Sequence, residues 1–475
     1  MLFNSTAFAV FLPVVFILYW FVFNRRISLQ NGLLLVASYF FYGWWDWRFL
    51  SLLFLSTLVD YVIGISLERT TEPRRRKLWL FISVATNLGV LGFFKYYNFF
   101  IDSWAEMLRA FGFTPNLRTL NIILPVGISF YTFQTLSYTI DIYRNKTRAT
   151  SDFLAFAAFV SFFPQLVAGP IERASNLMPQ FLRPRKFGFA NGMAGLRQIG
   201  WGLVKKVVIA DNCAPYVEQA FLNPAAYSGS ELFLAVIYFA FQIYCDFSGY
   251  SDIARGTAKL FGFELMVNFR TPYFSRNIAE FWQRWHISLS TWFRDYVYIP
   301  LGGNRISQTR TILNVFVVFV LSGLWHGANW TFIVWGALNA LYFIPLMLLQ
   351  KHKKYRGGEN GDNAPRIREL PAICLTFLCA CFGWIFFRAE SIGDAWKYLL
   401  AIFQPSLFSV PDQLRAFLPA LLIFVIIEWM GRRKEYPLLL ERNSFVSNVS
   451  YFVGITLLLV WFGNFGDHEF IYFQF

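Results

Sequence analysis

Charged residues are scarce in this chain. Asp, Glu, Lys and Arg make up 15% of its 475 residues, whereas 56% are hydrophobic and 20% are aromatic. Apolar windows recur at lengths near the roughly 20 residues that a helix needs to cross a bilayer. This composition excludes secreted and nuclear proteins. It predicts a single membrane domain over residues 1–475, although length alone would suggest three domains of about 150 residues.

Several enzyme motifs are also missing. The chain has no Gly-Lys-Ser/Thr phosphate loop, which argues against ATP-driven transport by this chain alone. The Gly-x-Ser-x-Gly elbow of serine hydrolases fails around Ser251, because position 253 is Ile. None of the four His has an Asp five positions later, so the His-x4-Asp arrangement of another acyltransferase group is absent.

Histidine and cysteine are few, and their spacing does not suggest a metal centre. His286 and His326 are 40 residues apart and lack a third candidate ligand. The five cysteines lie within or near apolar segments, at Cys213, Cys245, Cys374, Cys379 and Cys381. The last three have neither a CxxC pair nor a nearby His. We therefore expect core cysteines, no metal and no cofactor.

The positive charges are dispersed between the apolar segments. The excess of 14 is therefore interpreted as a set of topology signals, and no nucleic-acid partner is expected. Arg25-Arg26 follow 24 uncharged residues, which predicts a retained first span with an external amino terminus. Basic loops are predicted at Arg74–Lys77, Lys205-Lys206, Lys351–Arg356 and Arg432–Lys434.

The apolar stretches give the expected organisation. They run near 7–23, 31–45, 49–67, 79–101, 121–140, 153–168, 198–215, 231–263, 311–325, 329–350, 371–388, 414–430 and 447–465. Prolines and glycines after residue 120 predict re-entrant or interfacial helices there. A polar linker at 351–370 is expected to divide a larger part, 1–350, from closing helices at 371–475.

Residues 277–298 are predicted to form one helix. At helical spacing Trp282, His286 and Phe293 share a face, so His286 stands on an aromatic stripe, whereas Arg294 points elsewhere. The segment is too polar for lipid. We expect it to pack inside the protein or along the cytoplasmic interface.

Residues 321–330 form a Gly-containing break between two apolar runs, with His326 at its centre. An ionisable group at that depth marks a candidate functional site, and a neutral imidazole can act there as a base. Gly323 and Gly327 would let another backbone or a thin substrate approach. Asn329 could fix the imidazole tautomer or donate to a developing oxyanion.

A structural role for these histidines is the competing interpretation. One His in an apolar segment is more often a hydrogen-bonded structural residue than a catalyst. Scarcity favours function, because two of only four His fall in the two least ordinary segments. From the residues alone both interpretations stay open.

Motifs along nearly the whole chain are similar to those of the membrane-bound O-acyltransferase (MBOAT) family, in its bacterial branch of alginate and peptidoglycan O-acetylation. They include Trp282-Gln-Arg-Trp-His-Ile-Ser-Leu-Ser-Thr-Trp292 and Leu324-Trp-His-Gly-Ala-Asn329. The other matching segments are residues 1–5, 11–13, 125–134, 163–171, 246–252, 294–303 and 470–475.

The resemblance implies an all-α bundle of about eleven or more transmembrane helices around a central tunnel. It also implies that His326 is the principal catalytic residue and His286 the second motif histidine. Such proteins pass an acyl group from a cytoplasmic thioester to a hydroxyl. In this branch the implied donor is acetyl-CoA and the acceptor an exported polysaccharide such as alginate or peptidoglycan. A periplasmic transferase partner and the bacterial inner membrane are implied as well.

The hypothesis that follows has His326 acting as general base on an acceptor hydroxyl. A covalent acyl-enzyme would need Ser322 or His326 itself as nucleophile, and this alternative stays open. His286, Trp282, Trp285 and Arg294 are expected to bind or orient the thioester, with Asn329 beside His326. A transporter or flippase for a lipid-linked glycan is the rival from another class, and a non-catalytic scaffold is the third.

Overall fold

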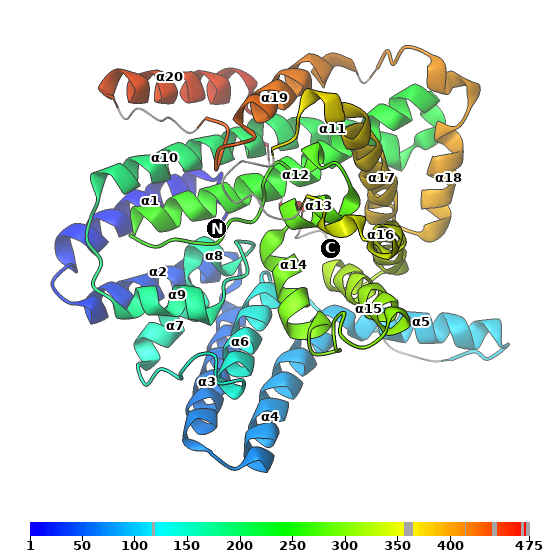
Figure 1. Ribbon diagram of the computed structural model, residues 1–475. Coiled ribbons are helices and arrows are strands. Elements are labelled where there is room, and N and C mark those ends of the chain that lie inside the picture. Colours follow the sequence, from blue (N-terminus) through cyan, green and yellow to red (C-terminus); the bar gives the residue numbers. More distant parts are fainter. Residues whose placement is uncertain (116–118, 356–363, 414, 439–443, 467–469, 472–475) are drawn as a thin grey trace. The chain divides into compact units, whose positions relative to one another are not determined.

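A computed structural model describes residues 1–115, 119–355, 364–413, 415–438, 444–466 and 470–471. They form two compact units (Figure 1). Unit 1 is Met1–Gly195 with Thr257–Met266, and unit 2 is Leu196–Gly256 with Val267–Phe475. The predicted linker at 351–370 lies within unit 2, and its residues 356–363 are outside the described ranges.

Among the described residues of unit 1, the regular elements are all helices. Its α-helices are α1 Thr6–Ile17, α2 Ile27–Asp46, α3 Leu50–Arg69, α4 Pro73–Leu91, α5 Tyr97–Ala110, α6 Ile128–Tyr143, α7 Phe153–Ser161, α8 Phe163–Leu166 and α9 Ala174–Leu182. Short turns of other helix types join some of them, at η1 Leu18–Val22, η2 Trp47–Phe49 and η3 Gly92–Tyr96. The starts follow ordinary capping rules: Ser5 accepts a hydrogen bond from Phe8 N, and Pro73 opens α4.

A buried carboxyl group joins three helices of unit 1. Asp60 on α3 is fully buried and accepts hydrogen bonds from Ser83 Oγ at 2.7 Å and Asn87 Nδ2 at 2.8 Å, both on α4. The Ser83 hydroxyl also lies 2.9 Å from Thr139 Oγ1 on α6. Because buried polar groups need partners, these contacts favour one pairing of α3, α4 and α6.

Unit 2 holds the remaining helices, some of them shared with unit 1 at the boundaries. They are α10 Phe189–Leu203, α11 Asp211–Leu222, α12 Gly229–Leu260, α13 Ile278–Arg284, α14 Ile287–Phe293, α15 Gln308–His326, α16 Trp330–Leu348, α17 Leu370–Arg388, α18 Ile392–Ile402, α19 Leu418–Gly431 and α20 Phe445–Phe462. The shorter turns are η4 Val204–Ala210, η5 Pro224–Ala226, η6 Pro272–Phe274, η7 Arg294–Tyr298, η8 Lys351–Lys353, η9 Ile367–Glu369, η10 Pro405–Phe408 and η11 Arg415–Phe417.

The predicted fold class is confirmed: the protein is an all-α, multi-pass membrane protein, with no strand among the described residues. Within the described ranges, seven helical segments are long and apolar enough to cross a bilayer, at 27–69, 73–110, 229–260, 308–326, 330–348, 367–388 and 445–462. They coincide with predicted apolar stretches. The central tunnel stays a prediction.

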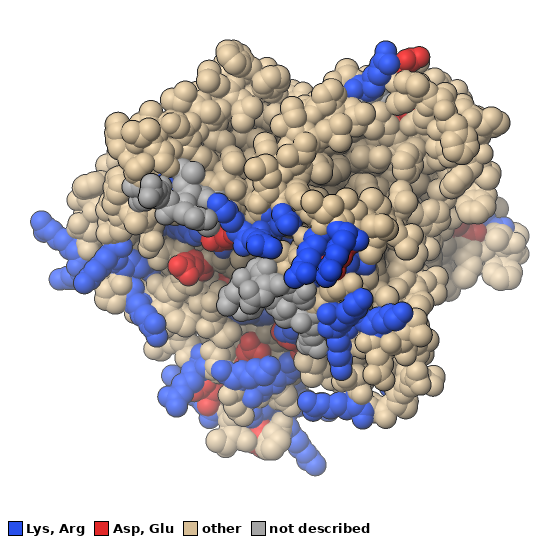
Figure 2. Space-filling model, turned by 45° about the horizontal axis from the view of Figure 1, so that its top comes forward, with Lys and Arg blue, Asp and Glu red and all other residues tan. Residues whose placement is uncertain are grey.

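Large apolar side chains are exposed on the helices, as lipid contact requires. Trp47, Phe81 and Trp461 are 74%, 67% and 72% exposed. On the face drawn in Figure 2, Lys and Arg gather in patches, and a broad area of the same face carries no charged side chain. This distribution is typical of a protein whose basic groups lie at the membrane–water boundary.

The prediction of a basic loop at Lys205-Lys206 is wrong. Both residues are buried within η4, a π-helical turn. Lys205 Nζ lies 2.5 Å from Asp252 Oδ2, and Lys206 Nζ lies 2.8 Å from both Asp211 Oδ1 and Asp246 Oδ1. Charges can be buried when they are paired in this way, and the partners on α11 and α12 could not be inferred from a local run of two lysines.

Two glycines bring α15 and α16 into backbone contact, and Figure 1 shows these helices side by side. A Cβ on Gly323 would stand 2.1 Å from the carbonyl oxygen of Phe332, and one on Gly336 would stand 2.4 Å from that of Phe319. The close approach predicted at Gly323 is thus made by another helix of the same chain. Small residues serve this purpose in membrane helix pairs.

Substitution Gly323→Ala should destabilise the protein by roughly 1–3 kcal/mol, because the added methyl group forces α15 and α16 apart. Gly454→Ala on α20 is the matched control, since beyond the adjacent backbone of α20 no described atom lies within 4 Å of its Cβ position. There the better helix propensity of Ala should be neutral or add up to about 1 kcal/mol. Thermal melting of both variants in one detergent checks this, and equal midpoints would contradict the packing account.

Candidate active site

His326 ends α15 and is enclosed by aromatic rings of unit 2. Its side chain is 2% exposed. The centre of its ring lies 4.9 Å from Trp325, 5.2 Å from Trp335 on α16 and 5.4 Å from Phe387 on α17. Three consecutive membrane helices therefore meet at this imidazole.

His286 stands at a break in the chain, so the prediction of one continuous helix over 277–298 is wrong. Helix α13 ends at Arg284 and α14 begins at Ile287, with η7 completing the segment. His286 has φ 43° and ψ 55°, in the left-handed region, and is the N-cap of α14. This conformation is unfavourable for an ordinary residue and persists only where surrounding contacts impose it. The expected packing inside the protein is correct, since His286 is fully buried.

Asn268 supplies the contacts that hold this break. Its backbone carbonyl accepts Ile287 N–H at 2.9 Å. Its side-chain Oδ1 accepts Ser288 N–H at 3.3 Å and Ser288 Oγ–H at 2.9 Å, and lies 3.0 Å from His286 Nδ1. The imidazole of His286 does not accept the first N–H groups of α14, as the side chain of an N-cap Ser or Asp would. Asn268, which lies outside the helix, accepts them instead. Sequence reasoning missed this residue.

The fold brings the two histidines together. Their ring centres are 6.4 Å apart, with the ring planes at 60° to one another. Trp325 lies beside both, at 5.8 Å from His286 and 4.9 Å from His326. Residues 40 positions apart in the sequence thus share one buried location.

The environment of His286 keeps its ring neutral. The Phe247 ring on α12 meets it edge-on with centres 4.6 Å apart, and the Phe269 ring stacks at 6.3 Å. Burial among these groups penalises the charged form and lowers the pKa of His286 to about 3. The imidazole therefore offers a lone pair, without a positive charge, throughout the physiological range.

Both predicted tryptophans belong to the same aromatic cluster. Trp285 is 1% exposed, and its ring centre lies 5.5 Å from Phe281 and 5.0 Å from Trp384. Trp282 lies 5.7 Å from Trp335, the ring that also contacts His326. The α13 helix thereby connects the surroundings of the two histidines.

The other two predicted residues have contacts of a different kind. The Arg294 side chain is 52% exposed and pairs with Asp295 at 2.7 Å. Asn329 caps α16 by accepting Thr331 N–H at 3.0 Å, and its amide group donates to the carbonyl oxygen of Glu390 at 2.8 Å. Their roles toward the substrates stay predictions.

Comparison with known proteins identifies the family of this chain. The family model described as "MBOAT, membrane-bound O-acyltransferase family" matches residues 144–354. The chain is 42% identical over 448 residues to the "Probable alginate O-acetylase AlgI" of Pseudomonas aeruginosa, which covers 92% of this chain and 82% of that protein. The chain belongs to the membrane-bound O-acyltransferase family.

Two further relatives are similar to this MBOAT chain at lower sequence identity. The peptidoglycan O-acetyltransferase of Helicobacter pylori is 36% identical over 428 residues, covering 84% of this chain and 79% of its own. The teichoic acid D-alanyltransferase of Bacillus subtilis is 28% identical over 283 residues, with 57% and 70% covered. The expected family is confirmed, and this MBOAT protein is an O-acyltransferase.

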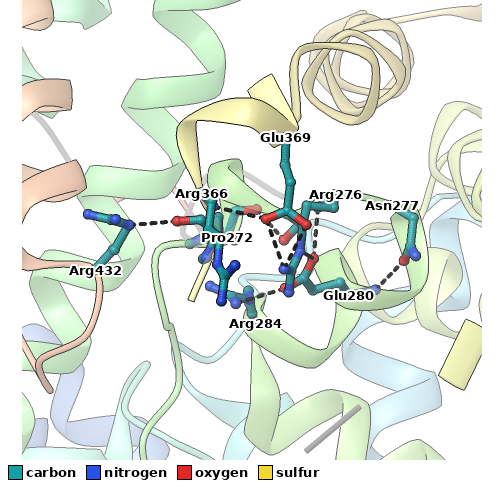
Figure 3. A network of polar contacts seen from close by, with 10 residues as sticks. Pro272, Arg276, Asn277, Glu280, Arg284, Arg366, Glu369 and Arg432 are labelled. Atoms are coloured by element: carbon teal, nitrogen blue, oxygen red, sulfur yellow. Dashed lines mark hydrogen bonds and ion pairs between the residues drawn. The ribbon is translucent and has the colours of Figure 1, made fainter. Parts of the chain in front are cut away.

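A network of ion pairs anchors α13 just before the histidine break (Figure 3). Glu280 is 2% exposed and accepts hydrogen bonds from Arg276 Nη2 at 2.9 Å and Arg284 Nη2 at 2.8 Å. Arg276 also pairs with Glu369, at the start of α17, at 3.1 Å. Since α13 and α17 both supply rings to the site of this MBOAT chain, the network helps to fix the site's walls.

The neutral state of His286 predicts an acid-sensitive fold. A histidine has a pKa near 6.5 in the unfolded chain, so between about pH 6.5 and 3 the unfolded chain binds more protons than the folded one. The stabilising contribution is complete above about pH 6.5 and is lost as pH falls toward 3. Melting midpoints of wild type should therefore fall more steeply over pH 7 to 4.5 than those of His286→Asn, which tolerates the left-handed backbone. Parallel curves would contradict the assignment.

Proposed function

We propose that this O-acyltransferase moves acetyl groups from cytoplasmic acetyl-CoA to a hydroxyl acceptor, for O-acetylation of an exported polysaccharide such as alginate or peptidoglycan. Support comes from the similarity to the probable alginate O-acetylase of Pseudomonas aeruginosa and to the peptidoglycan O-acetyltransferase of Helicobacter pylori. The inner membrane of a bacterium is the proposed location, because there a cytoplasmic donor and an exported polymer lie on opposite sides.

The observation that carries the proposal is the pair of buried histidines. His326 and His286 lie with ring centres 6.4 Å apart in a setting made of aromatic rings. A permanent cation would be costly there, whereas a neutral imidazole is a base that burial permits. Of the other two histidines, His352 lies in η8, outside this cluster, and His468 is not among the residues that the structure describes.

In the proposed reaction His326 acts as general base. The acceptor hydroxyl oxygen attacks the thioester carbonyl carbon while His326 takes the hydroxyl proton. The tetrahedral intermediate then collapses, the carbon–sulfur bond breaks, and the thiolate sulfur receives the proton from the imidazolium. The products are an ester and a free thiol. His286 borders the reacting groups, and Trp282 and Trp285 shape the surface that holds the acetyl end of the donor.

The immediate acceptor is proposed to be a hydroxyl of a periplasmic transferase, which completes delivery to the polymer. Donor and acceptor must reach His326 through the protein, because its side chain is 2% exposed. This requirement is met if the donor enters from the cytoplasmic face and the acceptor from the opposite one. Arg294, which is half-exposed, is a candidate for contact with donor phosphates, since guanidinium groups pair well with phosphate oxygens.

Substitution His326→Ala should reduce acetyl transfer by about 100 to 10,000-fold, because the hydroxyl loses its base. Transfer is measured in proteoliposomes with labelled acetyl-CoA, or as acetyl content of the exported polymer at matched membrane abundance. His352→Ala is the control, since this histidine lies outside the aromatic cluster, and it should keep wild-type activity.

Three outcomes would overturn parts of this proposal. If the His326→Ala variant transfers acetyl groups at the wild-type rate, His326 is not the general base. Retained activity in both His286→Ala and His286→Gln would remove His286 from the site. Movement of a lipid-linked glycan without any thioester cleavage would favour the flippase hypothesis. Membership of the O-acyltransferase family supports acyl transfer instead.

A further inference from the structure

Asn268 does more than cap a helix, because its side chain also meets the ring of His286. The amide oxygen Oδ1 lies 3.0 Å from Nδ1 of His286, and the amide nitrogen Nδ2 donates to Ser251 Oγ at 3.2 Å. Asn268 is 1% exposed. A buried amide of this kind has a fixed direction, and that direction determines where the proton of the neighbouring imidazole sits.

The orientation of the amide follows from its contact with the backbone. A backbone N–H can only donate, so the amide atom that faces Ser288 N at 3.3 Å must be the oxygen. The reversed amide would set two donors against each other. The same oxygen faces His286 Nδ1, and two acceptors at 3.0 Å would repel. Nδ1 must therefore carry a hydrogen.

We infer that Asn268 is a positioning residue that holds His286 in the tautomer with the proton on Nδ1 and the lone pair on Nε2. Asn268 Oδ1 accepts from Ser288 N–H and Ser288 Oγ–H and lies beside His286 Nδ1. The contacts that hold the turn between α13 and α14 therefore also select one of the two neutral tautomers of the His286 ring. The second nitrogen of a functional histidine is commonly set by the hydrogen bond that the first one makes.

The inference deepens the proposed function and rests on it for its catalytic meaning. With Nε2 as acceptor, His286 receives a hydrogen bond from a hydroxyl or from protonated His326, and it does not donate to the thioester carbonyl oxygen. The two histidines then differ in role. His326 takes the proton of the acceptor hydroxyl. His286 accepts a hydrogen bond at Nε2, either from that hydroxyl, which it orients, or from the imidazolium that forms on His326, which it stabilises.

Four rings pack on His286 in the described part of the chain. The rings that pack on it come from α12, from the segment before α13 and from α15, namely Phe247, Phe269, Trp325 and His326. Of these four, His326 is titratable. Burial keeps the pKa of His286 near 3, so the ring stays neutral over the range in which an enzyme assay is run, and the contact with Asn268 Oδ1 selects between its two neutral forms.

The first experiment reads the tautomer directly. The full-length protein is labelled with ¹⁵N at histidine, purified in detergent, and its imidazole signals are recorded near pH 7, with His286→Gln identifying the signal of residue 286. We expect a protonated Nδ1 and a non-protonated Nε2. A proton on Nε2, or on both nitrogens, would overturn the inference. This readout needs no activity, so it separates failure of the inference from failure of the proposed function.

The second experiment uses Asn268→Asp. A carboxylate accepts from the same partners, but its charge favours the imidazolium, so the pKa of His286 should rise by about 1 to 3 units. The acid limb of the pH–rate profile should then move upward, with activity recovering at high pH. Ser251→Ala is the matched control, because it removes the contact to Nδ2 and leaves Oδ1 in place. Equal loss at every pH in Asn268→Asp would mean a purely structural role and overturn the inference.

Discussion

The contact between Asn268 and the break at His286 is the constraint on which the site depends. Without Asn268 as acceptor, the first N–H groups of α14 would lose these hydrogen bonds, and the strain of the left-handed turn would not be compensated by them. In a continuous helix the imidazole would follow the aromatic stripe that its spacing predicts. The break sends it instead to a position beside Trp325 and His326.

Buried charges stabilise the frame around this turn. The pairs of Lys205 with Asp252 and of Lys206 with Asp246 tie η4 to α12, and Phe247 and Ser251 on the same helix contact His286 and Asn268. Such pairs are costly to bury and destabilising to break. They specify a geometry more than they add stability, and here the specified geometry includes the neighbours of both histidines.

Much of the fold could be predicted from composition and spacing. The ends of α15, α16, α17 and α20 fall within a few residues of the predicted apolar runs, because membrane helices must satisfy every backbone group internally. His286 and His326 were selected by their scarcity and by a family resemblance. Their proximity, by contrast, depends on a contact with Asn268, 18 residues upstream, and on rings from three other helices. Periodicity carries no information about such long-range partners. For the same reason the sequence predicts a loop at Lys205 and Lys206, whose buried partners are distant in the chain.

The glycine contact between α15 and α16 has a consequence for the reading of sequence variation. Position 323 is three residues from His326. It must be glycine because a side chain there would collide with the backbone carbonyl of Phe332, and this reason involves no reactant. By this account, loss of activity on substitution of Gly323 would come from a displaced helix. Closeness in sequence to a catalytic residue therefore does not show whether a substitution removes a catalytic group or disturbs the packing of the helices.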